Sequence, residues 1–456
     1  MLNKLTIFLS LFAFAAVLNA QNNTKSIYSS YGVGVFQSQD ANAFKGMAAS
    51  SYGFRHGFKP NLANPLSIAG RERVDFNLGF EFNNRLQQTS AAQRTDLAGN
   101  VNHVSFAFNS LRINKEKRYV NPLDTTELLS KWRKIRINTM LGLAPYTAMD
   151  YDYAIEGDTS TFESLLSVGG KGGLNSIYFN NAFQVLDTTI SVGISVQRLF
   201  GSITESRLKN LLSDSAAVGY QQTIDQRIKG MRFGLTLGYS GKPKPKSDMW
   251  HTFTAGYTFK STLNSETDVL LRTVQDFFQV KDTLSLSSPK GTIELPSILR
   301  LGYGLENENK WAWSVDFQSS DLTQYSNTID SSSMNRMTRI STGFILNPER
   351  MMQLTENLEW FRKVEWSFGA FYQTGPFAVQ NTQSLSSINE YGISFGVALP
   401  MKSRFNDKKT VVSYMYLNAQ YSQRGTINDG LIKEDIFRVN LAFNLSDKWF
   451  KKRAYY

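Results

Sequence analysis

The sequence of 456 residues contains no cysteine and only three histidines. Without thiols, the chain forms no disulfide and has neither a thiol nucleophile nor a thiolate metal ligand. The histidines His56, His103 and His251 lie far apart in the sequence, which argues against a zinc or haem site. We therefore predict no metal and no cofactor.

Long apolar runs are also missing after the first twenty residues, so no later segment is predicted to be a transmembrane helix. Residues 1–20 carry Lys4, an apolar stretch and Ala20 before polar residues, and they predict a cleaved signal peptide. No cysteine follows, which excludes a lipoprotein anchor. Phe, Tyr and Trp still make up 13% of the sequence, and aromatic residues without long apolar runs are typical of outer-membrane β-barrel walls.

The clearest β-strand pattern lies at residues 435–445. Its odd-numbered residues from Phe437 to Leu445 are all apolar, whereas residues 438, 440, 442 and 444 are Arg, Asn, Ala and Asn. Successive side chains of a strand point to opposite faces, so this strand has one apolar and one polar face. The pattern recurs along most of the chain. We predict an all-β fold, a transmembrane antiparallel β-barrel with its apolar face toward lipid; the alternative is a large secreted β-sandwich or propeller.

About fourteen strands can be counted, and a barrel with both chain ends in the periplasm requires an even number. The predicted strands lie at residues 74–82, 101–113, 135–155, 176–185, 190–196, 220–239, 253–259, 298–305, 311–317, 334–346, 364–372, 391–399, 411–421 and 435–445. The long polar links at 83–100, 156–175, 203–219, 260–294 and 318–333 are predicted external loops. Two further links, 114–134 and 347–363, have the residue spacing of short periplasmic helices.

Residues 21–72 have no strand pattern and are rich in Gly, Ser, Asn and Ala, which allow tight turns and close packing. We predict that they form a plug, or hatch, in the barrel lumen; the alternative is a mobile periplasmic leader. Residues 73–446 would form the barrel, and residues 447–456 a basic periplasmic tail. The net charge of +11 suggests contact with anionic membrane lipids or lipopolysaccharide, whereas the scattered basic residues do not indicate nucleic-acid binding.

Both ends of the sequence carry family features: Y-S-S-Y-G-V-G at 28–34 and the run 46–67, then the runs 389–400 and 423–453. In these stretches the chain resembles the FadL-type outer-membrane transporters of fatty acids and hydrocarbons, in particular a branch of that family from Gram-negative bacteria. The resemblance implies a fourteen-stranded barrel with an N-terminal hatch. It also implies a hydrophobic ligand that leaves sideways through a defect in the third strand.

By position, the resemblance places the hatch signature on Asn64 and Pro65, with Leu66 where the family usually has alanine. Gly46 and Arg55 are further candidate plug residues within the same run.

The third-strand defect would fall on the segment from Gly142 to Pro145. Proline has no N–H to give to a β-ladder, so Pro145 would bend or open the wall for a physical reason that does not depend on the family. The alternative is that Pro145 lies above the membrane, where the strand merely curls.

Aromatic residues on strand faces that should be wet are candidates for a ligand cavity, because ligand pockets are mostly apolar with a few polar groups. The candidates are Phe371, Tyr414, Tyr416 and Phe344. For Phe344 two registers compete, since Ile340, Phe344 and Leu346 alternate with Arg339, Ser341 and Gly343. The alternative for the other three residues is that they pack against the plug.

The leading functional hypothesis is passive transport of a hydrophobic small molecule across the outer membrane of a Gram-negative bacterium. The rival hypothesis is a non-transporting barrel subunit of an outer-membrane secretion or assembly complex, with other outer-membrane proteins as partners. An enzyme is the least favoured class and no catalytic residue is predicted. The one hydrolase-like pattern, G-x-S-x-G at residues 392–396, falls in a predicted strand rather than in the strand-to-helix turn that it requires.

Overall fold

The structure, a computed structural model, describes residues 25–447 apart from short gaps. The gaps are residues 55–58, 72, 114–116, 120–127, 131–134, 160–161, 186–188, 212–217, 245–246, 276–278, 308–309, 329–333, 348–363, 381–384, 403–411 and 429–430. The predicted signal peptide and nearly all of the predicted basic tail therefore lie outside the described residues. Within the described part of the chain, no helix is long and apolar enough to cross a membrane.

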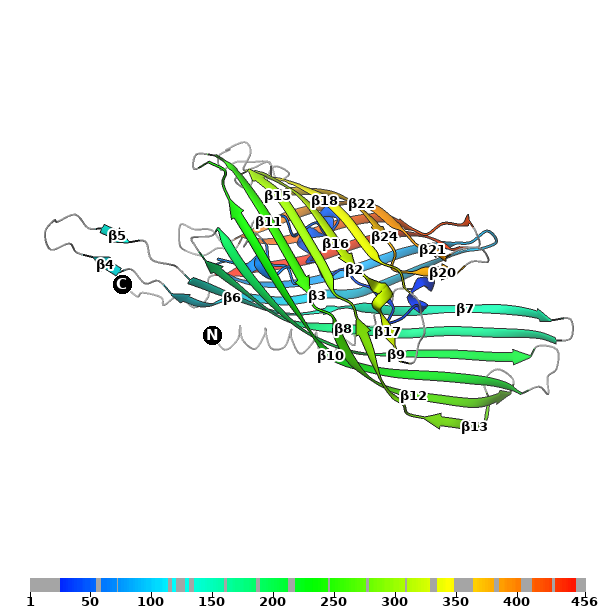
Figure 1. The fold of residues 1–456 in the computed structure, drawn as a ribbon. Coiled ribbons are helices and arrows are strands. Elements are labelled where there is room, and N and C mark those ends of the chain that lie inside the picture. Colours follow the sequence, from blue (N-terminus) through cyan, green and yellow to red (C-terminus); the bar gives the residue numbers. More distant parts are fainter. Residues whose placement is uncertain are drawn as a thin grey trace.

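The chain forms a closed antiparallel β-barrel of fourteen strands (Figure 1). Each of the fourteen barrel strands, here called a stave, consists of one labelled strand or of two that follow each other. The staves in chain order are β2 (Val74–Gln88), β3 (Gln93–Ile113), β6 (Ile135–Pro145) with β7 (Thr147–Thr159), β8 (Phe162–Val185), β9 (Ile190–Leu211), β10 (Gly219–Gly241), β11 (Met249–Thr258) with β12 (Ser261–Gln275), β14 (Lys290–Leu295) with β15 (Ile298–Asn307), β16 (Trp311–Ser320), β18 (Met337–Leu346), β19 (Glu365–Thr374), β22 (Glu390–Lys402), β23 (Val412–Arg424) and β24 (Lys433–Asp447). The ladder between β2 and β24 joins the first and last staves and closes the wall.

Outside these staves the described residues contain a few short elements, namely β13 (Gln279–Ser287), β17 (Ser326–Asn327), the hairpins β4 (Lys117–Tyr119) with β5 (Leu128–Ser130) and β20 (Ala378–Gln380) with β21 (Leu385–Ser387), and the 3₁₀ helix η4 (Leu322–Gln324).

The wall has its apolar face outside, as the alternating pattern predicts. On β24, Phe437 and Leu445 are 47% and 49% exposed, whereas Asn440 is fully buried on the opposite face. In lipid the outer row is stabilised, because removing a Phe or Leu side chain from water is worth about 1.5–3 kcal/mol.

Several predicted external loops are in fact strands. Residues 83–100, 156–175, 203–219 and 260–294 largely continue the barrel ladders, so that β8 is 24 residues long whereas β16 has 10. The physical reason is that backbone pairing continues into segments in which neither face is uniformly apolar, so the alternating signal disappears although the strands go on. At 114–134, the short β4–β5 hairpin replaces the predicted helix, and 348–363 lie outside the described residues.

Residues 25–71, here called the N-terminal segment, pack against the inward-facing side of the wall (Figure 1, blue). The segment contains the two-residue strand β1 (Val35–Phe36) and the 3₁₀ helices η1 (Ile27–Ser30), η2 (Asn42–Met47) and η3 (Pro65–Ile68). Element η1 contacts β7, η2 contacts β19, β22 and β23, and η3 contacts β8 and β9. Its apolar side chains, including Phe44, Met47, Leu62 and Leu66, are almost completely buried, so the protein core lies between this segment and the wall.

Candidate functional site

The wall is interrupted between β3 and the third stave. The ladder between β3 and β6 runs from Ile113–Ile135 to Val104–Leu143 and then ends. Strand β6 stops at Pro145, and β7 continues the stave in pairing with β8 and with β1. Among the described residues no ladder joins β7 to β3. We call this interruption, between residues 93–103 of β3 and β7, the seam.

The N-terminal segment takes up backbone groups of the third stave at the seam. The carbonyl oxygen of Tyr146 accepts the backbone N–H of Gln37 at 2.9 Å, and that of Pro145 accepts the Gln39 side-chain amide at 2.6 Å. Next along the stave, Val35 pairs with Ala148 in a short antiparallel ladder. Buried carbonyl groups need such partners, above all at membrane depth, where no water is available. The N-terminal segment therefore stands where the ladder to β3 would otherwise continue.

A cavity of about 370 Å³ opens at the seam. Its larger apolar and aromatic side chains come from β7 (Tyr151 and Tyr153), from the N-terminal segment (Ile27) and from the residue before β24 (Ile432), whereas β3 contributes polar residues. Charged side chains complete it: Lys25, Arg94, Asp96 and Asp152. The size lies in the range of small-molecule pockets, about 300–1,000 Å³.

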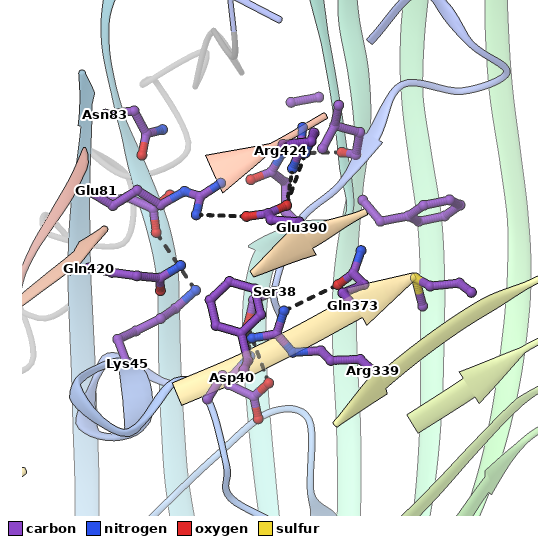
Figure 2. A pocket seen from close by; sticks show the side chains of 18 of the residues that line it. Ser38, Asp40, Lys45, Glu81, Asn83, Arg339, Gln373, Glu390, Gln420 and Arg424 are labelled. Atoms are coloured by element: carbon purple, nitrogen blue, oxygen red, sulfur yellow. Dashed lines mark hydrogen bonds and ion pairs between the residues drawn. The ribbon is translucent and has the colours of Figure 1, made fainter. Parts of the chain in front are cut away.

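A second cavity, of about 130 Å³, lies in the lumen between the N-terminal segment and the wall (Figure 2). Its lining is strongly charged: six cationic residues, Lys45, Arg85, Arg300, Arg339, Arg424 and Arg438, and three carboxylates, Asp40, Glu81 and Glu390. An apolar solute placed here would have to desolvate these charges, which costs free energy without new hydrogen bonds. This lumen cavity is therefore a poor route for a hydrocarbon.

Ion pairs join most of these charges. The Arg424 guanidinium lies 2.6 Å from Glu390, and Arg85 lies 2.7 Å from the carboxylate of the neighbouring Glu434. Lys45 Nζ lies 3.7 Å from Glu81. Burial lowers the pKa of the Lys45 ammonium, and the Glu81 carboxylate opposes that shift.

Charged side chains of the wall also anchor the N-terminal segment. The Asp316 carboxylate accepts the backbone N–H groups of Ser51, Tyr52 and Gly53 at 2.5, 2.7 and 3.2 Å. Ser26 donates its hydroxyl to Glu434 at 2.7 Å.

Three of the four predicted lumen aromatics face inward. Phe371 lines the lumen cavity beneath Arg339, whose guanidinium carbon lies 3.9 Å from the ring centroid. Tyr416 and Tyr414 pack with alanines of the wall and with Ala43 of the N-terminal segment. These two tyrosines therefore make the packing contact that the alternative prediction described.

The lumen prediction for Phe344 was wrong. Phe344 lies on the outer face of β18 together with exposed Ile340, and its ring stacks on Trp311 at 6.1 Å. Residues 339, 341 and 343 face inward instead, so the register with Arg339 in the lumen is the one that forms.

The predicted plug residues lie in close contacts within the N-terminal segment and with the wall. The side chain of Asn64 caps η3 by accepting the N–H of Leu66 at 3.0 Å, with Pro65 at the first helical position. Gly46 lies so near the wall that an added Cβ would be 2.7 Å from Gly396 Cα. Arg55 lies outside the described residues.

The two residues predicted for the lateral opening lie on β6, next to the point where the seam begins. Gly142 faces Leu62 of the N-terminal segment, which would collide with any added Cβ, and Pro145 ends β6. Sequence reasoning missed the residues that cap the interruption, Gln37 and Gln39, and the charged lumen network. No local motif marks either group, because the partners lie from tens to hundreds of residues away in the sequence and on a wall whose register is unknown beforehand.

Comparison with known proteins gives a family and a fold. The family model described as BamG matches residues 1–118 and 122–456. Among solved structures, a FadL homologue of Pseudomonas aeruginosa is 11% identical, with TM-score 0.53 and coverage of 90% of this chain and 98% of the other. The toluene transporter TodX of Pseudomonas putida is 14% identical, with TM-score 0.50 and coverage of 91% and 99%. No curated protein sequence matches. The predicted FadL-like barrel is confirmed as a fold, whereas the family that matches is BamG, not FadL.

Proposed function

This chain belongs to the BamG family, and we propose that it is a plugged outer-membrane barrel through whose seam a hydrophobic small molecule reaches the membrane. The observation that carries the proposal is the missing ladder between β3 and β7, with a cavity of about 370 Å³ at that place. The similar solved structures include a toluene transporter, which supports a hydrocarbon-like compound as the solute.

The chemistry of the two cavities supports the seam as the route. The lumen cavity is lined by nine charged side chains, whereas the seam cavity has four, which lie beside two tyrosines and aliphatic side chains. Exposed apolar residues stand on both strands that border the seam, since Leu97 of β3 is 77% exposed and Ile155 of β7 is 51% exposed. A hydrophobic compound would thus move along the seam and would not cross the charged centre of the lumen.

The N-terminal segment acts as the plug in this proposal. It closes the seam from inside through β1, Gln37 and Gln39, and Lys25 and Ile27 form part of the seam cavity. In this proposal the seam opens when these contacts and those of η1 with β7 are released, whereas the ion pairs deeper in the lumen remain.

A cross-link over the seam tests the proposal. The Arg94 side chain reaches the carbonyl of Asp152 at 3.4 Å, so cysteines in the R94C/D152C variant can be bridged by a short bis-thiol-reactive reagent. The chain has no other cysteine to react. We expect the bridge to abolish uptake of toluene into proteoliposomes. When the bridging reagent can be cleaved by a reductant, adding the reductant should restore uptake.

The matched control is T204C/D225C, whose positions pair in the intact β9–β10 ladder of the same extended sheet. Cross-linking this pair should leave toluene uptake unchanged. Uptake that persists with the seam bridged would refute the route proposed here.

A second candidate function, a non-transporting subunit of an outer-membrane assembly, is favoured by strand β13. Among the described residues it pairs with β12 alone, and Val280, Leu284 and Leu286 are 50–68% exposed. An exposed apolar edge strand is a site for pairing with another chain. A photo-cross-linking residue at position 286 should then give one discrete adduct in whole cells, whereas the same residue at position 229, in the middle of the paired sheet, should give none.

A further inference from the structure

Two arginines of the lumen cavity differ from the other cations around them. Arg300 of β15 and Arg339 of β18 both line the cavity, and both also line a smaller void of about 20 Å³ beside it. Among the described residues, neither arginine forms an ion pair with a carboxylate, whereas Lys45, Arg85, Arg424 and Arg438 each do. Within the described part of the chain, these two arginines therefore differ from the other four cations of the cavity in having no carboxylate at ion-pair distance.

The contacts of Arg339 hold its guanidinium in place without using all of its donors. It donates to the Gln373 side-chain oxygen at 3.2 Å (Figure 2). It also donates to the Ala48 carbonyl at 3.1 Å, and its face rests on the Phe371 ring. A guanidinium has five N–H donors, so three remain for another partner. The Arg300 guanidinium lies over the Tyr52 ring at 5.4 Å.

Two carboxylates, Asp40 and Asp316, line the smaller void with these arginines, and both accept hydrogen bonds from neutral donors of the N-terminal segment. Asp40 accepts the Ser51 hydroxyl at 2.6 Å, the Asn61 amide at 2.9 Å and the Ser38 hydroxyl at 3.2 Å. Asp316 accepts three backbone N–H groups, as described above. These carboxylates lower the positive potential, but neither lies at ion-pair distance from Arg300 or Arg339 among the described residues.

We propose that the lumen cavity binds a small oxyanion, a phosphate or carboxylate group, at Arg300 and Arg339. Arginine forks match the geometry of such groups, and charge-assisted bonds are the stronger class of hydrogen bond. A cavity of about 130 Å³ has room for a group of this size with some water, but not for a large ligand. The bound anion would join the N-terminal segment at Ala48 to strands β15 and β18 of the wall. The site is separate from the seam and does not depend on the transport proposed there.

Equilibrium dialysis of the full-length protein in non-ionic detergent, at constant ionic strength in chloride, tests this site. Radiolabelled inorganic phosphate is the first probe and acetate the second. We expect saturable binding of one anion per chain. Binding of phosphate alone would identify a phosphate-type ligand, and binding of acetate alone would identify a carboxylate; either supports an oxyanion site.

Variants locate the binding. R300Q and R339Q should each weaken it about ten- to hundredfold, the loss expected for a charge-assisted hydrogen bond. The control is R336Q, because Arg336 directly precedes β18, the strand of Arg339, and its side chain is 67% exposed, so its loss should not change anion binding. If a glutamine variant does not fold, as judged by heat-modifiable mobility on gels, R300K and R339K keep the charge but lose the fork and should bind more weakly. The proposal would be overturned if no saturable binding were found, or if all folded variants bound the anion equally strongly.

Discussion

The seam and the lumen cavity lie along the same N-terminal segment, but different kinds of interaction hold the segment at the two places. At the seam, neutral hydrogen bonds from Gln37 and Gln39 cover the interruption of the wall, and one partly exposed ion pair, Lys25 with Asp150 at 3.4 Å, adds to them. In the lumen, buried ion pairs and the Asp316 carboxylate hold the segment. A neutral hydrogen bond contributes about 0.5–1.5 kcal/mol net, whereas removing one partner of a buried ion pair costs about 3–5 kcal/mol. The comparison teaches that the segment is more weakly held at the seam than at the barrel centre, so opening would begin at the seam.

Removal of the whole segment should have the largest effect, because it takes away both closures at once. Deletion of residues 27–68 leaves the wall ladders intact and empties the lumen of η1, η2 and η3. We expect a water-filled pore and a strong rise in single-channel conductance in planar bilayers. A deletion variant that folds and conducts no better than the full chain would show that the segment does not close the barrel.

Removal of one central carboxylate should have the next largest effect. Glu434 accepts bonds from Arg85 at 2.7 Å and from Ser26 at 2.7 Å, and it lies 3.5 Å from Arg424. Glu434→Ala leaves two buried arginines without this partner, so we expect the free energy of unfolding to fall by about 3–5 kcal/mol. Urea titration followed by tryptophan fluorescence measures the change. Glu266→Ala, which breaks the exposed pair with Lys229, serves as the control and should leave the unfolding midpoint unchanged.

The contrast between the two regions also explains what the sequence could predict. Alternating apolar residues such as Phe437 to Leu445 predicted the barrel, its strand number and its apolar outer face, because contact with lipid imposes a period of two on every stave. Pro145 indicated the end of β6 because proline has no N–H. The charged network and the Gln37 and Gln39 contacts are long-range and have no period, so they could not be read from one sequence. For the same reason Phe344 was placed on the wrong face, since apolar and polar residues alternate evenly around it.

Close packing of the segment against the wall should be sensitive at single glycines. An added Cβ at Gly193 of β9 would lie 2.8 Å from Pro65 Cβ and 3.1 Å from the Leu66 side chain. Gly193→Val should therefore reduce the free energy of unfolding by about 1–3 kcal/mol, as overpacking does in other cores. The same substitution at Gly234 of β10 is the matched control, because its nearest neighbour would be 3.5 Å away. Equal losses in both variants would mean that valine weakens the strand itself and not the contact with η3.

The smallest effect is expected from Pro145→Val, and it separates two causes of the seam. The N–H of Tyr146 donates to Leu174 of β8, and neighbouring N–H groups of a strand point to opposite sides, so a new N–H at 145 would point toward β3. One added hydrogen bond contributes about 0.5–1.5 kcal/mol, which would lower toluene uptake by about two- to tenfold at most. Strand β1 still occupies the edge of β7, so the ladder to β3 should remain open above this point. Pro400→Val, at a proline inside the intact β22–β23 ladder, controls for the loss of a proline and should not alter uptake. If Pro145→Val instead abolished uptake in a folded barrel, the proline would be the main cause of the interruption, and the contacts of the N-terminal segment would only follow from it.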